Sequence, residues 1–152
     1  MRGGKQLLRP VELYELGLPA SLNTLVAGWN TRNGGQTRYQ LDIVGDFAAL
    51  PESLAVALFR ITQECLTNIA KHAAATLAKV ALTVDADRVT LTIQDNGIAN
   101  ALPFADGPGI GLLGIRERVT ALQGHLALAI VQPHGLRVEV GLPILSMTEG
   151  QP

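Results

Sequence analysis

Very short connections between segments of alternating apolar and polar residues are the feature that most constrains the fold. Residues 79–84 and 88–94 both alternate and are joined by Asp85-Ala86-Asp87, while residues 126–132 and 136–142 are joined by Pro133-His134-Gly135. Alternation is the pattern of a half-buried strand. Connections this short join antiparallel neighbours, because parallel strands need a crossover of about a dozen residues or more. The chain therefore predicts two β-hairpins.

Helical segments surround these hairpins. Residues 7–29 and 51–72 have helical spacing, and a further alternating strand at 37–44 lies between them. Residues 95–108 are rich in glycine, proline and asparagine, which predicts a loop, and residues 110–122 return to helical spacing. This order predicts an α+β fold, a two-layer α/β sandwich in which helices cover one face of a mixed, mostly antiparallel sheet.

Composition excludes several classes of function. A chain of 152 residues can form one domain, and its 12 Lys and Arg against 13 Asp and Glu leave no basic stripe for nucleic acid. No apolar stretch approaches the roughly 20 residues that span a bilayer. The single cysteine, Cys65, cannot form an internal disulfide or a zinc site. We therefore expect a cytoplasmic domain without direct nucleic-acid contact and without a membrane segment.

The long predicted helix carries a polar stripe. Glu64, Asn68 and Lys71 follow one another at intervals of four and three residues, with His72 next to them. In an α-helix, at about 100° per residue, the first three fall within an arc of roughly 60°. The apolar positions that occupy the neighbouring arc are Leu58, Ile61, Cys65, Leu66, Ile69 and Ala73. A stripe at the edge of the core suits the floor of a cleft, although the solvated face of an amphipathic helix has the same pattern.

Two further motifs flank the predicted loop. Asp95-Asn96-Gly97 ends a strand, where an aspartate can enter a pocket without disrupting the sheet, although a plain turn is the alternative. The segment Gly109-Ile110-Gly111-Leu112-Leu113-Gly114 places three glycines where a loop enters a helix. Unpaired N–H groups at such a junction can bind a phosphate chain. A Rossmann site is not indicated, because no strand directly precedes the glycines, and the lysine of a Walker loop is missing.

In this order and spacing the motifs resemble those of the GHKL superfamily of ATPases, which includes gyrase, Hsp90, histidine kinases and MutL. Residues 64–73 (ECLTNIAKHA) resemble its N box, Asp95-Asn96-Gly97 its first glycine box, and residues 109–119 (GIGLLGIRERV) its second. The Arg-Glu-Arg run in the last motif is typical of nitrate-type and hexose-phosphate-type kinases. The chain thus resembles the ATP-binding catalytic (HATPase) domain of a bacterial sensor histidine kinase over residues 7–143.

The resemblance implies a role for each motif residue. Asn68 would be a catalytic residue and the protein ligand of the Mg²⁺ that bridges the phosphates of ATP, while Glu64 would orient or deprotonate the attacking group. Asp95 would accept a hydrogen bond from the adenine amino group, and Gly97 would keep the base pocket open. The remaining expected nucleotide contacts, from the long helix, the lid and the start of the third helix, are Lys71, His72, Gly109, Gly111, Leu112 and Gly114.

Two positions depart from the family pattern. Ala99 stands where the family has a second glycine, and Leu136 follows Gly135 where the family has a threonine whose hydroxyl helps to hold adenine. The loss of one hydrogen bond costs about 0.5 to 1.5 kcal/mol net. We therefore expect weakened but surviving ATP binding.

The expected function is that of the Mg-ATP-binding catalytic domain of a two-component sensor histidine kinase. This transferase would pass the γ-phosphoryl group to a histidine on a dimerisation domain, and from there to a response regulator, for which the resemblance implies a helix-turn-helix output. None of His72, His125 and His134 has the setting of an acceptor, so the chain alone is not expected to autophosphorylate. We expect one catalytic domain over residues 1–143, with 1–20 as the linker from absent dimerisation helices and a polar tail at 144–152. The parent would be cytoplasmic or membrane-bound with this part in the cytoplasm.

Two alternatives stay open. Ala99 and Leu136 suit a non-catalytic nucleotide-sensing or protein-docking module of the same GHKL fold. A self-sufficient ATPase would use Glu64 to activate water, but the short lid and the run from Arg116 to Arg118 argue against it.

Overall fold

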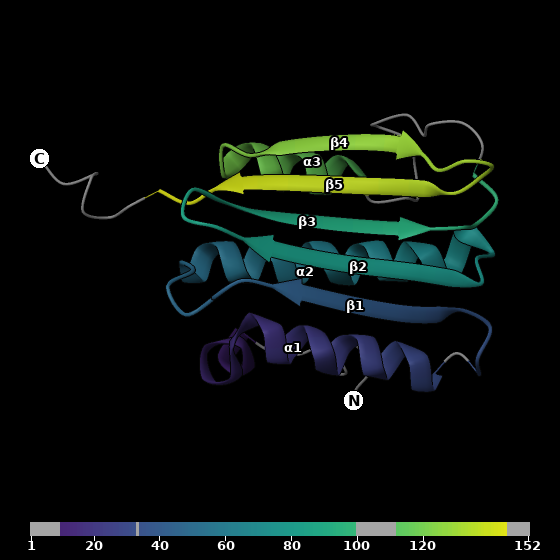
Figure 1. Cartoon of the computed structure of the whole chain (residues 1–152), viewed down its shortest axis with the longest axis horizontal. Helices are drawn as coiled ribbons and strands as arrows, with labels where there is room; N and C mark the ends of the chain where they lie inside the picture. The colour runs from purple at the N-terminus through teal and green to yellow at the C-terminus, as the bar shows by residue number, and fades with distance from the viewer. Residues whose placement is uncertain (1–9, 33, 100–111, 146–152) are drawn as a thin grey trace, which may run out of the picture.

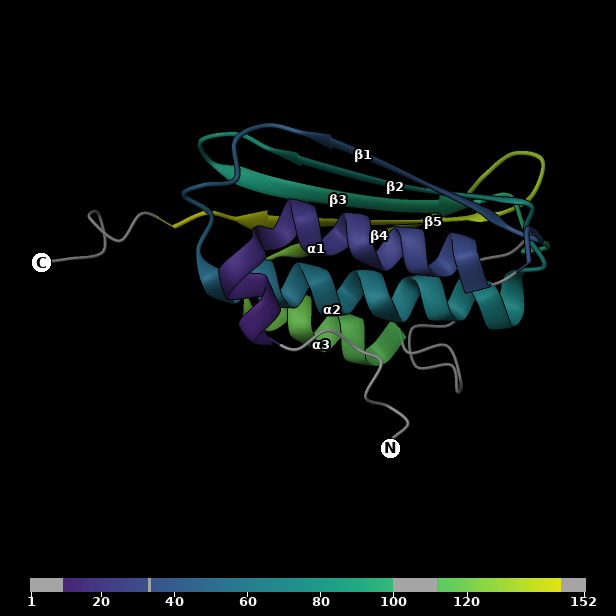
Figure 2. The ribbon, with the colours of Figure 1, turned by 90° about the horizontal axis from the view of Figure 1, so that it is seen from below.

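The computed structural model of the chain describes residues 10–32, 34–99 and 112–145, and within them three α-helices cover one face of a five-stranded sheet (Figures 1 and 2). The helices are α1 (Pro10–Arg32), α2 (Glu52–Asn68) and α3 (Leu112–Ala121). The strands are β1 (Arg38–Val44), β2 (Leu77–Val84), β3 (Arg88–Asp95), β4 (His125–Ile130) and β5 (Leu136–Pro143). The predicted α+β sandwich is confirmed.

The strand order is β1-β2-β3-β5-β4, and every neighbouring pair is antiparallel except β1 and β2. Both predicted hairpins, β2–β3 and β4–β5, are present. The parallel pair is joined through α2, as a crossover connection requires. Because β5 pairs with β3, the end of β3 and the start of β5 lie side by side although about 40 residues separate them.

Alternation along the strands separates a buried face from an open one. Val80, Ile93 and Val138 lie opposite one another in register and point toward the helices, where all three are buried. Their polar neighbours Lys79 and Arg137 are exposed. Figure 2 shows that the described helices leave the other face of the sheet uncovered. Burial of each aliphatic side chain contributes about 1.5 to 3 kcal/mol, so this pattern fixes the register of the sheet.

α1 closes the outer edge of β1. The side chain of Asn30 donates from Nδ2 to the Tyr39 carbonyl (2.9 Å) and accepts from the Tyr39 N–H at Oδ1 (2.8 Å). The Trp29 and Tyr39 rings lie 5.8 Å apart, and the guanidinium of Arg32 lies 4.5 Å above the Trp29 ring. Asn30 therefore takes the place of a neighbouring strand, which protects an edge that could otherwise pair with another chain.

The end of the long helix differs from the prediction. The α-helix stops at Asn68 and continues as one π-helical turn, Ile69–Ala73, before Ala74 takes a left-handed conformation (φ 52°). A π-turn closes its hydrogen bonds over five residues and is often found at functional sites. No helix in the described part of the chain has the length and apolarity needed to cross a membrane.

Candidate functional site

A pocket of about 180 Å³ lies where the end of α2, the end of β3 and the start of β5 meet. Its described lining is mainly apolar and includes Cys65, Ile69, Ile93, Leu112, Leu136 and Val138. Three side chains add polar groups: Asn68 and His72 from the end of the long helix and Asp95 from β3. An apolar pocket with a few converging polar groups is the usual form of a small-molecule site.

Asp95 stands at the last position of β3, as the sequence predicts, and its side chain is only 6% exposed. It is the only carboxyl group among the described lining residues. Its Oδ1 accepts the backbone N–H of Gly97 at 2.7 Å. Burial raises the pKa of Asp95, and the backbone N–H groups of Gly97 and Leu136 offset part of that rise. The pocket therefore contains a fixed hydrogen-bond acceptor in an apolar setting.

Gly97 allows the loop after β3 to approach the end of the long helix. A Cβ at this position would collide with the carbonyl of Ala73, and the next residue, Ile98, donates its N–H to that carbonyl at 2.8 Å. Gly97 is buried and is not among the described lining residues. The close backbone approach is thus what requires glycine here.

Only part of the predicted polar stripe faces the pocket in the described structure. Asn68, which is half-buried, and His72, which is exposed, line the pocket. Glu64 and Lys71 are also exposed and are not among the described lining residues. A π-turn advances the chain by a smaller angle per residue than an α-turn. In a regular α-helix the residue four positions after Asn68 is already closer to it in angle, at about 40°, than the residue three positions after it, at about 60°. The π-turn brings it closer still.

The connection between β4 and β5 forms one wall of the site. Gly135 (φ 126°) donates its N–H to the carbonyl of Ala99 at 2.7 Å and lies so close to the carbonyl of Asp95 that a side chain would collide with it. His134 contacts the Gly97 carbonyl through Nδ1. The sequence predicts no role for His134 at this site, because the pairing of β3 with β5 is what brings it to this loop.

The two departures from the family pattern both line the pocket. Among the described non-glycine residues, positive φ angles occur at Ala74 and Gln123, so the Ala99 backbone accepts a side chain without that strain. Leu136 is half-buried, and its backbone N–H lies close enough to the Asp95 carboxylate to lower the pKa of that group. The substitutions therefore change the wall of the pocket and leave its frame intact.

Of the three glycines predicted to contact the phosphates, Gly114 lies among the described residues. Gly109 and Gly111 lie outside the described residues. Gly114 lies in the first turn of α3, where it is exposed and an added Cβ would meet no atom within 4 Å. Leu112 begins α3, is buried and lines the pocket.

The chemistry of the pocket fits an adenine nucleotide. Apolar walls suit the faces of a purine, and the Asp95 carboxylate can accept from an amino group on its edge. The described residues contain no group of three or more His, Cys, Asp or Glu that could hold a metal by themselves. The Asn68 amide oxygen suits Mg²⁺, which binds oxygen and commonly takes most of its ligands from phosphates and water.

Comparison with known proteins identifies the family. Residues 53–146 match the family described as "Histidine kinase-, DNA gyrase B-, and HSP90-like ATPase". The chain is 39% identical to the signal transduction histidine-protein kinase/phosphatase UhpB of Salmonella typhimurium, over 90% of this chain and 26% of UhpB. It is 31% identical to the sensor histidine kinase YxjM of Bacillus subtilis, over 91% of this chain and 35% of YxjM.

Solved structures share the fold. The blue-light activated histidine kinase of Erythrobacter litoralis superposes with a TM-score of 0.66 at 20% identity, covering 84% of this chain and 45% of that chain. The chain spans 26% and 35% of the lengths of the two relatives named above. Because the family match covers more than half of its residues, the chain belongs to the histidine kinase-, DNA gyrase B- and HSP90-like ATPase family, as a domain of the sensor histidine kinase type.

Proposed function

We propose that this domain binds ATP with Mg²⁺ in the pocket and catalyses transfer of the γ-phosphoryl group to a histidine on a separate dimerisation domain. The observation that carries the proposal is Asp95, a buried carboxylate that lines a mainly apolar pocket at the end of β3. Desolvation makes such a group costly, so its presence needs a reason that packing does not supply.

Asp95 would select the base. A carboxylate only accepts hydrogen bonds, so it favours the amino group of adenine over the carbonyl oxygen that guanine carries at the same ring position. The N–H of Gly97 holds one of its oxygens, which keeps the carboxylate in one orientation before the nucleotide arrives. Apolar contact with Ile93 and Leu136 would exclude water from the base.

The phosphates would extend from the base along the end of the long helix toward the start of α3. Asn68 and His72 line this side of the pocket, with Lys71 exposed beside them. Leu112 opens α3, whose N-terminal N–H groups can bind an anion, and Gly109, Gly111 and Gly114 are proposed to let the backbone approach the phosphates. When bound at the Asn68 amide oxygen, Mg²⁺ would neutralise phosphate charge.

Glu64 would act on the incoming acceptor. It lies one turn before Asn68 and is exposed, which leaves it accessible to a histidine that another domain presents. Phosphoryl transfer depends mainly on positioning and charge neutralisation, so an orienting carboxylate and a metal ligand on one helix are a sufficient set.

The remaining parts of the proposal concern the whole protein. Residues 1–143 are the catalytic domain, with 1–20 leading from the dimerisation helices and 144–152 as a tail. The parent is a two-component sensor kinase acting in the cytoplasm, and its phosphohistidine passes the group to a response regulator. The similarity to UhpB and YxjM, both longer than this chain, supports this arrangement.

The experiment that tests this proposal is phosphotransfer between separate domains. The chain is mixed with a dimerisation domain that carries the acceptor histidine, taken from the parent protein, and with ATP labelled on the γ-phosphate. Label should appear on the dimerisation domain and not on this chain, and Asn68→Ala should reduce the rate by at least about a hundredfold, as loss of a key transition-state contact does. Unchanged labelling with Asn68→Ala would show that the metal site is elsewhere.

A non-catalytic nucleotide-sensing or docking module is the second candidate. It is favoured by Ala99 and Leu136, which replace family residues in the lining itself. In that case the chain would bind ATP but support no transfer to any dimerisation domain.

A further inference from the structure

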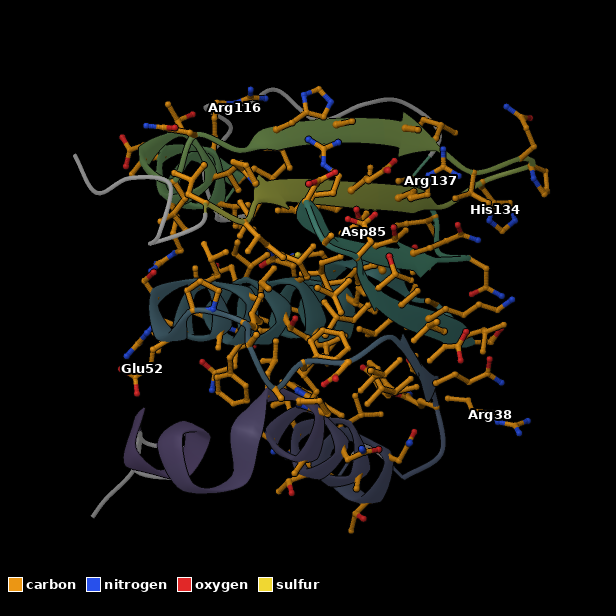
Figure 3. The ribbon with its side chains drawn as sticks, turned by 60° about the vertical axis from the view of Figure 1, so that its left-hand side comes forward. Arg38, Glu52, Asp85, Arg116, His134 and Arg137 are labelled. Atoms are coloured by element: carbon orange, nitrogen blue, oxygen red, sulfur yellow. The ribbon has the colours of Figure 1, made fainter. Side chains whose placement is uncertain are left out.

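We infer that His134 is a positioning residue of the nucleotide site, holding the backbone of Gly97 and, through Gly97, the carboxylate of Asp95. His134 lies in the connection between β4 and β5, at one end of the sheet (Figure 3). The inference rests on the proposed function, since it assigns a role at the same pocket.

Two successive hydrogen bonds, here called the relay, connect His134 to Asp95 through the backbone of Gly97. The ring Nδ1 of His134 lies within hydrogen-bonding distance of the Gly97 carbonyl, and the N–H of Gly97 donates to Asp95 Oδ1 at 2.7 Å. A carbonyl oxygen only accepts, so Nδ1 is the donor. Both the neutral tautomer protonated at Nδ1 and the imidazolium can make this bond. One residue, Gly97, is therefore held from both of its backbone polar groups.

The backbone of the same connection supports the relay. Gly135 donates its N–H to the Ala99 carbonyl at 2.7 Å and lies against the Asp95 carbonyl too closely for any side chain. The connection thus touches the loop at Asp95, Gly97 and Ala99. The Gly135 contacts are made by backbone atoms, whereas His134 holds the loop through its side chain. A substitution at His134 can therefore change how firmly the loop is held.

His134 acts on the site more than on the fold. It is exposed and does not belong to the buried core. Its removal should leave the packing of α2 against the sheet unchanged while taking away one of the two hydrogen bonds of the Gly97–Ile98 peptide, whose N–H still donates to the Ala73 carbonyl. Gly97 would then hold the Asp95 carboxylate less firmly, and nucleotide affinity would fall.

The test compares His134→Ala, which removes the donor, with His134→Asn, whose side-chain amide nitrogen occupies nearly the place of Nδ1. Calorimetric titration of the intact chain with a non-hydrolysable ATP analogue should show roughly three- to tenfold weaker binding for His134→Ala, the loss that one hydrogen bond produces. His134→Asn should bind within about twofold of the parent chain. His125→Ala is the matched control, because His125 is also exposed but lies at the opposite end of its hairpin, and its binding should not change.

A second readout needs no nucleotide. Amide hydrogen exchange at Gly97, followed by nuclear magnetic resonance, should be faster by roughly three- to tenfold in His134→Ala than in the parent or the asparagine variant. Unchanged exchange at Gly97, or a weakened affinity that asparagine does not restore, would overturn the assignment of His134. Absence of binding by the parent chain, with the exchange difference present, would instead refute the proposed function and leave the contact established.

Discussion

The carboxyl group of Asp95 is buried at the end of β3, and burial is the largest influence on its pKa, which lies above the usual value of 3.8. The folded chain therefore holds a proton on this group over a pH range in which the unfolded chain has released it. Stability must then fall as pH rises from about the unfolded pKa through the raised folded pKa. The ionised group costs folding free energy at neutral pH, as is common where function requires a buried charge.

Asp95→Asn removes this titration. The unfolding free energy of the variant, relative to the parent chain, should increase between pH 3.8 and neutrality and then level off, because only the parent ionises a buried group. Urea unfolding at a series of pH values measures the difference. If the difference in unfolding free energy stays flat or falls as pH rises, burial does not disfavour the ionised form of Asp95.

Alanine substitution should have opposite effects on stability at two glycines, Gly97 and Gly114. Gly97→Ala should destabilise the fold by about 1 to 3 kcal/mol, because the new methyl group collides with the Ala73 carbonyl. Gly114→Ala should stabilise it by about 0.5 to 1 kcal/mol, because Gly114 is helical and its Cα faces open space. Urea unfolding of both variants should give shifts of opposite sign, and shifts of the same sign would contradict the described packing.

At the scale of elements, most of the fold could be predicted from the sequence. The strands show period-two alternation. The connections of three residues between β2 and β3 and of five residues between β4 and β5 are too short for a parallel crossover and require antiparallel pairing. The junction of β3 with its loop at Asp95 follows from where alternation stops. These features are local, and local patterns determine secondary structure well.

The π-turn and the wall of the pocket could not be predicted in this way. Ile69–Ala73 has the composition of ordinary helix, and the residues that contact its last member, Ala73, are Gly97 and Ile98, which are distant in the sequence. The contact between His134 and Gly97 spans 37 residues and depends on the pairing of β5 with β3. Which members of the polar stripe face the pocket is therefore a tertiary outcome. The roles assigned to Glu64 and Lys71 stay predictions.

The hydrogen bonds between Asn30 of α1 and Tyr39 of β1, here called the clamp, give a prediction at the element scale. Asn30→Ala should lower the unfolding free energy by about 1 to 2 kcal/mol, since it leaves the N–H and carbonyl of Tyr39 without these partners. Asn23→Ala is the control: Asn23 is exposed on the same helix and its side chain donates to the Pro19 carbonyl within that helix, so its change should stay within about 0.5 kcal/mol. Equal effects in the two variants would contradict the clamp.

At the scale of the whole molecule, the reactivity of the Cys65 thiol measures how often the core opens, because Cys65 belongs to the buried core and also lines the pocket. Burial, with a smaller contribution from Glu64, raises the pKa of its thiol to about 12. At pH 8 the folded protein should react with a thiol reagent at least about a thousandfold more slowly than the urea-unfolded chain, because reaction requires opening of the core. ATP should slow the reaction further. Comparable rates in the folded and unfolded states would mean that the pocket floor is open.

If this molecule is an adenine-nucleotide-binding catalytic domain, the intact chain must bind a non-hydrolysable ATP analogue together with Mg²⁺, which calorimetric titration measures. We expect saturable one-to-one binding, weaker binding of the GTP analogue, and a roughly ten- to hundredfold loss in Asp95→Asn, the effect of removing a hydrogen bond to a charged group. Absence of binding by the folded chain, or equal binding of both analogues that Asp95→Asn leaves unchanged, would contradict that assignment.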